Sequence, residues 1–238
     1  MRLSPLKNGI GAPGLFYIFR ENFEEVISYC IRTFVKEGDK CFDIGTNIGI
    51  WSLFMSETCG STGHVYSVEP APSTLKNLRE NIELSRKTNI TVLPTALGDI
   101  KGEINIYTPS DPGRASLAPE GAGNSVEKVP ISRLDEVWAD LGRPQISFVK
   151  MDVEGAEPLV LAGGGEFFKQ CRPVVTSEIN IKKLSNLGKT PDDILNFFRG
   201  WNYDIFTFNE EKGQLVQINT CGGGDVVFIP KDSKTPNF

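Results

Sequence analysis

The sequence predicts an α/β protein with a doubly wound, mostly parallel sheet, because short apolar strands alternate with amphipathic helices along most of its 238 residues. Two features strengthen this prediction. A strand at residues 40–44 breaks at a glycine-rich turn and enters a helix, and the strand at 64–69 ends on an acidic residue. In sheets of this class, ligands bind beyond the carboxyl ends of the strands.

The individual elements follow from the spacing of apolar residues. A first helix is expected over residues 22–35, and Gly38 ends it. The expected strands lie at 40–44, 64–69, 90–93, 103–107, 148–153, 173–179, 203–208 and 225–229. The expected later helices lie at 48–57, 72–85, 156–169 and 190–200. The last two strands are expected to form an antiparallel pair.

Two segments interrupt this alternation. Residues 1–36 are expected to form an irregular lead-in and a cap helix, and residues 37–238 the ligand-binding domain. Within that domain, residues 109–128 are rich in Gly, Pro, Ser and Ala. A connection of this length is either a mobile lid over the site or disordered.

The composition excludes several classes of function. The net charge is -5 and basic residues do not cluster, which argues against a nucleic-acid partner or an anionic membrane surface. The chain holds five scattered cysteines and one histidine, so a zinc site is not expected and the thiols are expected to be reduced. The chain shows no signal peptide and nothing near the roughly 20 apolar residues of a membrane span. A cytoplasmic location is therefore expected.

The most specific motif is the turn after the first strand. Gly45 and Gly49 let the backbone approach a ligand where a Cβ would collide, and Thr46 and Asn47 lie between them. The helix that follows presents free N–H groups to a polar part of that ligand. Asp43 is interpreted as pointing into the turn, where a carboxylate repels a pyrophosphate but suits the ammonium of an amino-acid-bearing cofactor. A turn without a ligand is the alternative.

Two later strand ends fit a nucleoside. Glu69 lies twenty residues after Gly49 and is placed to accept hydrogen bonds from ribose hydroxyls, whether of NAD or of S-adenosylmethionine. After the third strand, Ala96, Leu97 and Gly98 are small or apolar and suit an adenine ring, although a tight turn explains the same residues.

A third cluster of polar residues suggests a reaction site. Lys150, Asp152 and Glu154 alternate along a strand and so are expected on one face at the carboxyl end of the sheet. Glu178 closes the next strand near the same place. Three charged groups are unusual in a purely structural buried strand, with a structural salt bridge as the alternative. The single histidine, His64, begins a strand at the opposite end of the sheet, so proton removal is expected to fall to a carboxylate, Lys150 or water.

Six strings of residues, in order and with typical spacing, resemble the FkbM-type methyltransferases. They are FDIGTNIG preceded by GDK, VYSVEP, TALGD followed by Gly102, SRLDE, VKMDVEGAE and SEI. The resemblance runs from about residue 37 to residue 180. Thr46 stands where the family more often has alanine, and the regions before residue 36 and after residue 182 match only loosely.

The resemblance implies a class I methyltransferase fold with an antiparallel last strand, S-adenosylmethionine as donor, and O-methylation of a sugar or natural product. The residues implied for cofactor binding are Asp43, Gly45, Thr46, Asn47, Gly49, Glu69, Pro70, Ala96, Leu97, Gly98 and Asp152. Those expected at the reaction are Asp152, Glu154, Lys150 and Glu178. No metal ligands are assigned, although some related enzymes use a divalent ion.

The partner expected from these features is a small hydroxylated acceptor whose identity the sequence does not give. Two other functions remain open. An NAD-dependent oxidoreductase is disfavoured by Asp43 and by the missing third glycine of a dinucleotide motif. A non-catalytic module that keeps a cofactor pocket is disfavoured by the acids at 152, 154 and 178.

Overall fold

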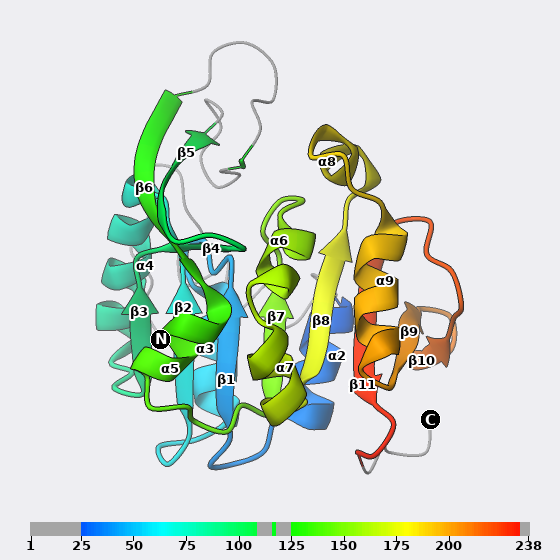
Figure 1. The fold of residues 1–238 in the computed structure, drawn as a ribbon. Coiled ribbons are helices and arrows are strands. Elements are labelled where there is room, and N and C mark those ends of the chain that lie inside the picture. The colour runs from blue at the N-terminus through cyan, green and yellow to red at the C-terminus, as the bar shows by residue number, and fades with distance from the viewer. Residues whose placement is uncertain (1–24, 109–115, 118–124, 234–238) are drawn as a thin grey trace.

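The computed structural model describes residues 25–108, 116–117 and 125–233 of the chain. Its centre is an eight-stranded sheet in the order β10-β9-β11-β8-β7-β1-β2-β3, with helices on both faces (Figure 1). Strands β3, β2, β1, β7 and β8 are parallel, β11 is antiparallel to both β8 and β9, and β10 is antiparallel to β9. The predicted doubly wound, mostly parallel sheet with an antiparallel C-terminal strand is confirmed.

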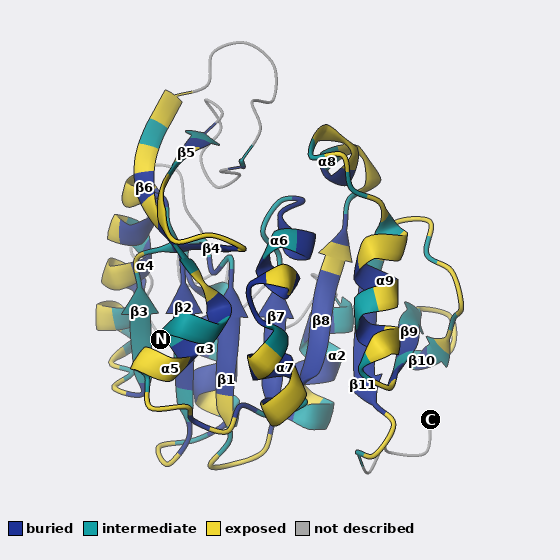
Figure 2. Ribbon diagram, in the orientation of Figure 1, coloured by how far each residue is buried: buried dark blue, intermediate teal, exposed yellow. Residues whose placement is uncertain are grey.

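The strands of this sheet are short and their burial is highest at the centre. They are β1 (Lys40–Ile44), β2 (His64–Val68), β3 (Ile90–Leu93), β7 (Phe148–Met151), β8 (Val174–Ile179), β9 (Tyr203–Asn209), β10 (Gln214–Gln217) and β11 (Gly224–Pro230). Figure 2 shows the middle strands in dark blue between helices whose outer sides are exposed. Strands buried on both faces are typical of parallel sheets, which is why they read as continuous apolar runs.

Two groups of helices cover the two faces of the sheet. One face carries α2 (Glu25–Phe34), α3 (Ile50–Thr58) and α4 (Pro72–Ser85). The other carries α5 (Leu134–Asp140), α6 (Glu157–Ala162), α7 (Gly165–Cys171), α8 (Ile181–Asn186) and α9 (Pro191–Gly200). Helix α9 begins as its sequence predicts, with Thr190 and Asp193 exchanging the two hydrogen bonds of a capping box.

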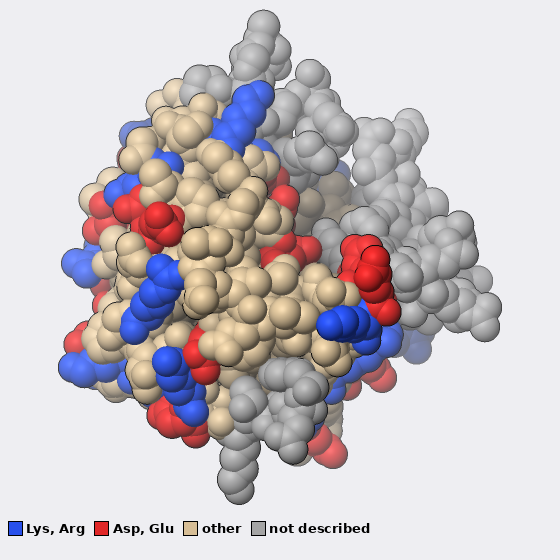
Figure 3. Space-filling view, turned by 90° about the vertical axis from the view of Figure 1, so that its right-hand side faces the viewer, with Lys and Arg blue, Asp and Glu red and all other residues tan. Residues whose placement is uncertain are grey.

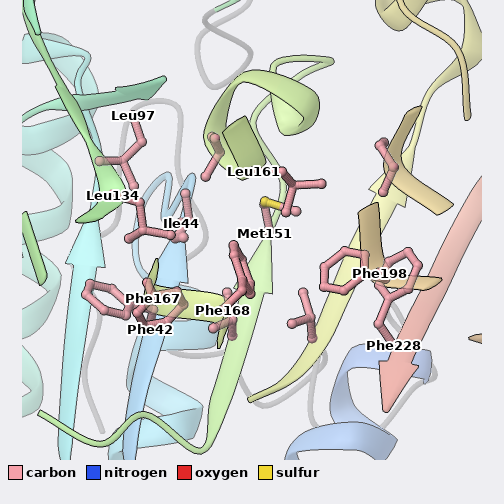
Figure 4. Packing of buried hydrophobic residues seen from close by; sticks show 14 of the residues in the cluster. Phe42, Ile44, Leu97, Leu134, Met151, Leu161, Phe167, Phe168, Phe198 and Phe228 are labelled. Carbon is pink, nitrogen blue, oxygen red and sulfur yellow. The ribbon is translucent and has the colours of Figure 1, made fainter. Parts of the chain in front are cut away.

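A row of aromatic side chains fills the core on the second face (Figure 4). Phe42 of β1 meets Phe167 of α7 edge to face, with ring centroids 5.6 Å apart. Phe198 of α9 stacks on Phe228 of β11 at 3.9 Å. Such pairs add about 0.5–1.5 kcal/mol each to the burial of their area. The same core cluster therefore packs against both β1 and β11, whose strand ends help to form the site.

A small second sheet projects over the strand ends. It consists of β4 (Ala96–Gly98), β5 (Gly102–Thr108) and β6 (Ser125–Arg133) in the order β4-β6-β5. Residues 125–128, expected to be part of a lid loop, are instead the start of β6 and pair with β5. Ser116 also bridges to Tyr107 of β5. The rest of the expected lid, at 109–115 and 118–124, lies outside the described residues, as do residues 1–24 of the expected lead-in.

The helix expected over 156–169 is wrong in one respect, because the chain forms two helices there. Gly163 and Gly164 separate α6 from α7. A Cβ on Gly163 would lie 1.9 Å from the carbonyl oxygen of Gly98, so the break lets the helix pair pack directly on β4. Strands β4, β6 and β10 and helices α5 and α8 were not anticipated, since each is short or lacks a clear apolar period.

Among the described residues, none of the helices is long and apolar enough to cross a membrane.

Candidate active site

A pocket of about 240 Å³ opens where β1, β2 and β7 end, beneath the second sheet. Ile44, Gly45 and Asn47 form one side of it, and Glu69 and Pro70 the next. The remaining described residues that line it are Val68, Thr74, Thr95, Ala96, Leu97, Ile106, Ser116, Leu117, Asp152, Val153, Glu154, Ala156 and Glu178. The pocket thus lies at the carboxyl ends of the parallel strands, as expected for this class of sheet.

The glycine turn forms the floor of this pocket by close backbone packing. Gly45 has φ +78°, and a Cβ there would lie 1.7 Å from the carbonyl oxygen of Asp152. Gly49 has φ +93°, and its Cβ would lie 2.6 Å from the side chain of Leu78 in α4. Asn47, at φ +54°, is also left-handed. Only glycine fits at positions 45 and 49, so the turn's shape follows from its sequence.

Glu69 lies on the pocket wall, where two backbone hydrogen bonds fix its carboxylate. Its Oε2 accepts a hydrogen bond from the backbone N–H of Asn47, and its Oε1 accepts one from that of Ala71, both at 2.9 Å. Burial raises the pKa of this carboxyl, while the two backbone donors oppose the rise. Each carboxylate oxygen can accept a second bond, so Glu69 can still receive hydroxyl donors from a ligand.

Asp43 does not line the pocket, contrary to the expectation that its carboxylate faces a ligand in the turn. It is fully buried beneath the turn. Its Oδ2 accepts a hydrogen bond from Ser52 of α3 at 2.6 Å, and its Oδ1 lies 3.8 Å from the Lys150 ammonium. Burial raises the pKa of Asp43, and Lys150 and Ser52 oppose that rise. The Asp43 carboxylate therefore supports the glycine turn through Ser52 and Lys150.

Asp43 belongs to a buried polar row that crosses four strands. Ser67 of β2 is its register partner on one side and Lys150 of β7 on the other, and Thr176 of β8 is the partner of Lys150. All four are at most 3% exposed. Register partners share a face, so the row faces α2 and α3. Ser52 closes the row by bonding to Ser67 as well as to Asp43.

Lys150, Asp152 and Glu154 do not share one strand face, although their alternation in the sequence predicted that they would. Strand β7 ends at Met151, so Asp152 and Glu154 lie in a loop, with Glu154 at φ +57°. Lys150 is buried, donates to the carbonyl oxygen of Gly45 at 2.9 Å and lies 3.5 Å from Asp152. Glu154 instead forms an ion pair with Lys183 of α8. Asp152, Glu154 and Glu178 line the pocket, and Lys150 does not.

Of the remaining residues expected to bind the cofactor, some line the pocket and others do not. Ala96 and Leu97 line the pocket, but as part of strand β4 rather than of a turn, and Pro70 lines it beside Glu69. Gly98 packs on Ile131 and does not reach the pocket, because β4 turns its end towards β6. Thr46 and Gly49 do not line it either. Thr46 donates to the carbonyl oxygen of Asp43 at 2.7 Å and so shapes the turn.

Several residues of the site had no signal in the sequence. Ser67 is brought beside Asp43 by the strand register, and Ser52 by the position of α3 above β1. Glu157, at the start of α6, accepts hydrogen bonds from the backbone N–H groups of Val153 and Gly155 and orders the loop between β7 and α6. Burial raises the pKa of Glu157 to about 7. A carboxylate in the first turn of a helix is the one pattern that pointed to it.

The histidine and the cysteines do not line the pocket. His64 bonds to Thr91 at the amino end of β2, as its position in the sequence indicated. The five cysteines are unpaired and four are buried. Within the described ranges, His, Cys, Asp and Glu do not gather in groups of three that would hold a metal ion. On the face in Figure 3, the described basic and acidic side chains are interspersed, without a continuous basic patch.

The sheet order, the antiparallel β11 between β8 and β9, and a pocket at a glycine turn after β1 together define the fold of a class I methyltransferase. The family model described as the methyltransferase FkbM domain matches residues 43–205, more than half of the chain. The chain therefore belongs to this family.

Curated relatives and solved structures agree with this assignment. The chain is 28% identical over 157 residues to "Methyltransferase 1" of Beauveria bassiana, which covers 52% of this chain and 63% of that protein. It is 28% identical over 178 residues to the "31-O-demethyl-FK506 methyltransferase FkbM" of Streptomyces tacrolimicus, covering 62% and 67%.

A crystal structure of "Methyltransferase FkbM" from Methylobacillus flagellatus superimposes with a TM-score of 0.51 at 17% identity, covering 80% of this chain and 43% of that one. At this identity the likeness shows the fold alone. The chain spans less than two thirds of the Beauveria protein and less than half of the Methylobacillus chain.

Proposed function

We propose that this protein transfers a methyl group from S-adenosylmethionine to a hydroxyl group of a small-molecule acceptor. The observation that carries the proposal is Glu69. Its carboxylate is fixed by two backbone donors at the wall of a pocket floored by the glycine turn, and keeps free acceptor sites for ribose hydroxyls.

The lining of the pocket fits the other parts of this cofactor. Ala96 and Leu97 offer apolar surface for the adenine, on the far side of Glu69 from the turn. Because Asp43 is buried, the cofactor's ammonium group falls instead to Asp152 and the backbone beside Gly45, both of which line the pocket. When bound, the cofactor supplies a methyl group already activated on a sulfonium.

The chain's own contribution is then to position the acceptor and remove its proton. Positioning supplies as much as about 7–11 kcal/mol, and a general base about 10²–10⁴-fold. Glu154 pairs with Lys183, Lys150 lies outside the pocket, and Glu69 and Asp152 are assigned to the cofactor, so proton removal is assigned to Glu178. The Lys150 ammonium holds Asp152 and the Gly45 carbonyl and acts as a positioning group.

An NAD-dependent oxidoreductase fits less well, for a reason different from the one the sequence suggested. The argument from Asp43 fails, since that carboxylate is beneath the turn. Instead, Glu69, Asp152, Glu154 and Glu178 all line the pocket, and the described lining residues include no Lys or Arg. Such a wall repels a pyrophosphate and accommodates the positive charge of a sulfonium.

Calorimetric titration with S-adenosylhomocysteine tests the cofactor assignment. Glu69→Gln should weaken binding by about 10- to 100-fold, because it replaces a charged acceptor of hydrogen bonds. Glu103→Gln is the matched control, since Glu103 lies on the surface of β5 and pairs with Lys128. Equal affinity of wild type and Glu69→Gln, or tighter binding of NADH than of S-adenosylhomocysteine, would contradict the proposal.

Methyl transfer itself separates an enzyme from a cofactor-binding scaffold. With a panel of hydroxylated acceptors and labelled S-adenosylmethionine, Glu178→Gln should lower kcat by about 10²–10⁴-fold. Its affinity for S-adenosylhomocysteine should stay near that of the wild type. A variant that keeps full kcat would remove Glu178 from proton transfer.

A further inference from the structure

A second cavity, of about 160 Å³, lies beside the first on the α2 side of the sheet. It is far larger than the roughly 10–15 Å³ that one water molecule needs. The described residues that matter for its chemistry are Lys150, Asp152, Thr176, Glu178 and Asp225, with Ile27 of α2 as an apolar wall. Asp152 and Glu178 line both cavities, so the second adjoins the proposed reaction centre.

The strand register concentrates negative charge in this cavity. Asp225 of β11 is the antiparallel partner of Glu178 in β8. Side chains of such partners stand about 4.5–5.5 Å apart at Cβ, and like charges directly opposite are destabilising. Burial, and then the charge of Asp152, raise the pKa of Asp225, while the charge of Lys150 opposes that rise.

Among the described residues that line the cavity, carboxylates outnumber basic side chains. Lys150 is the one basic residue among the described residues lining the cavity. It is already shared between Asp43, at 3.8 Å, and Asp152, at 3.5 Å. The Lys150 ammonium thus lies close to the carboxylates of Asp43 and Asp152, and its charge also lowers the pKa of Asp225.

An independent observation points to a ligand in the same cavity. Thr176 lines it, is only 2% exposed, and its hydroxyl has no hydrogen-bond partner among the described residues. A buried hydroxyl left unpaired has lost its hydrogen bonds to water without replacing them. Its register partner Lys150 is committed to Gly45 and Asp152.

We propose that this cavity binds a protonated amine of the methyl acceptor, so that the substrate carries an ammonium group beside the hydroxyl that is methylated. The inference rests on the proposed function for the identity of the acceptor. An ammonium brings three N–H donors and one positive charge, which satisfy Thr176 and relieve the repulsion around Asp225. A neutral polyol brings donors without the charge, and an anion is repelled.

Three small probes of similar size separate these possibilities: 2-aminoethanol, ethane-1,2-diol and glycolate. Each is titrated into the ¹⁵N-labelled protein, and the amide signals of Thr176 and Gly224 are followed by NMR. The titrations are made with and without saturating S-adenosylhomocysteine. We expect 2-aminoethanol to shift these signals in both conditions, and the diol and glycolate to leave them in place.

Two substitutions locate the binding. Asp225→Asn keeps the shape of the side chain and should weaken 2-aminoethanol binding at least about tenfold, as expected for a lost charged hydrogen bond. Thr176→Val should weaken it by about two- to tenfold. Asp140→Asn, which neutralises an exposed carboxylate on α5, should leave it unchanged.

The outcomes that overturn the proposal are distinct from a failure of the proposed function. Equal shifts from the diol, or no shift from 2-aminoethanol, would show that the cavity does not select an amine. Loss of the shift once S-adenosylhomocysteine is bound, or weaker S-adenosylhomocysteine binding in Asp225→Asn, would mean that the cavity holds the cofactor's own amino-acid end. A protein that does not bind S-adenosylhomocysteine but still binds 2-aminoethanol would contradict only the proposed function.

Discussion

The two halves of the site differ in how completely the chain satisfies its own polar groups. The turn half, formed by β1, residues 45–49 and Glu69, satisfies most of its buried polar atoms: Glu69 accepts from two backbone N–H groups, and Asp43 Oδ2 accepts from Ser52. Asp43 Oδ1 has no hydrogen-bond partner among the described residues, but it lies 3.8 Å from the Lys150 ammonium. In the strand-end half, formed by residues 150–157, β8 and the start of β11, the buried hydroxyls of Thr176 and Ser177 have no hydrogen-bond partner among the described residues. Asp225 and Glu178, both acidic, are register partners in β11 and β8.

This contrast indicates which half keeps its shape without a ligand and which half a bound ligand would stabilise. A fully bonded turn is preorganised, so a ligand that binds there does not have to order it. A half with unpaired buried groups has a free-energy cost that a ligand can relieve. The four predictions below test this difference, beginning with the largest expected effect.

Gly45→Ala should be the most damaging single change. Its Cβ would meet the backbone oxygen of Asp152 at 1.7 Å, and the residue would be held at φ +78°. Left-handed strain and overpacking each cost about 1–3 kcal/mol, so the free energy of unfolding should fall by roughly 5 kcal/mol in urea titrations. Gly165→Ala is the control, because its Cβ has open space; it should be neutral or slightly stabilising.

Lys150→Met should come next, because it leaves Asp43 buried without its cation. Breaking such a pair typically costs about 3–5 kcal/mol, measured by the same denaturation experiment. The double variant Lys150→Met, Asp43→Asn should recover most of this loss, since it removes the unpaired charge too. A single variant within about 1 kcal/mol of wild type would show that the polar row does not support the turn.

Glu157 should make the strand-end half sensitive to pH. Burial raises its folded-state pKa to about 7, above the ordinary value of 4.5 that it has in the unfolded chain. Below pH 4.5 both states hold the proton and the contribution to stability is fully present. As the pH rises towards 7, the unfolded state ionises first and stability is lost, by roughly 3 kcal/mol at about 1.4 kcal/mol per pH unit.

The control for this pH effect is Glu157→Gln, which keeps an oxygen for the N–H groups of Val153 and Gly155 but does not titrate. The difference in unfolding free energy between wild type and variant should shift in the variant's favour from pH 4.5 to 7.5. A difference that stays constant over that range would mean that Glu157 is ionised in the folded protein throughout.

The smallest effects should come from two buried hydroxyls, one in each half. Ser52→Ala removes a donor from Asp43 and should cost about 1–3 kcal/mol. Thr176→Val removes a hydroxyl that has no partner among the described residues, so it should be neutral or slightly stabilising. Equal destabilisation by the two substitutions, measured by thermal unfolding, would erase the proposed difference between the halves.

Much of the turn half could be predicted because its signals are local in the sequence. The strand, the glycine turn and the helix after it all lie within residues 40–58, and Glu69 directly follows the next strand. The order of helices and strands followed from apolar spacing for the same reason. What the sequence could not show was the face on which Asp43 lies, since that depends on Ser52, Ser67 and Lys150 meeting it across three other elements.

The strand-end half depended on contacts distant in the sequence and was predicted less well. Asp225 and Glu178 are 47 positions apart, and their pairing requires that β11 insert between β8 and β9. The alternation of Lys150, Asp152 and Glu154 failed as a guide because β7 ends at Met151, where the chain must bend towards Gly45. In this half the residue types indicated an acidic site, but only the tertiary structure shows which side chains lie next to one another.

The place of β11 also has a consequence for synthesis of the protein on the ribosome. This strand lies inside the sheet, between β8 and β9, although it follows both in the chain (Figure 1). A nascent chain that ends before residue 224 therefore leaves β8 and β9 with unpaired edges, which invite association with other chains. We expect translation pausing in this last stretch to promote aggregation, and the wall carrying Asp225 to form only when synthesis has passed residue 230.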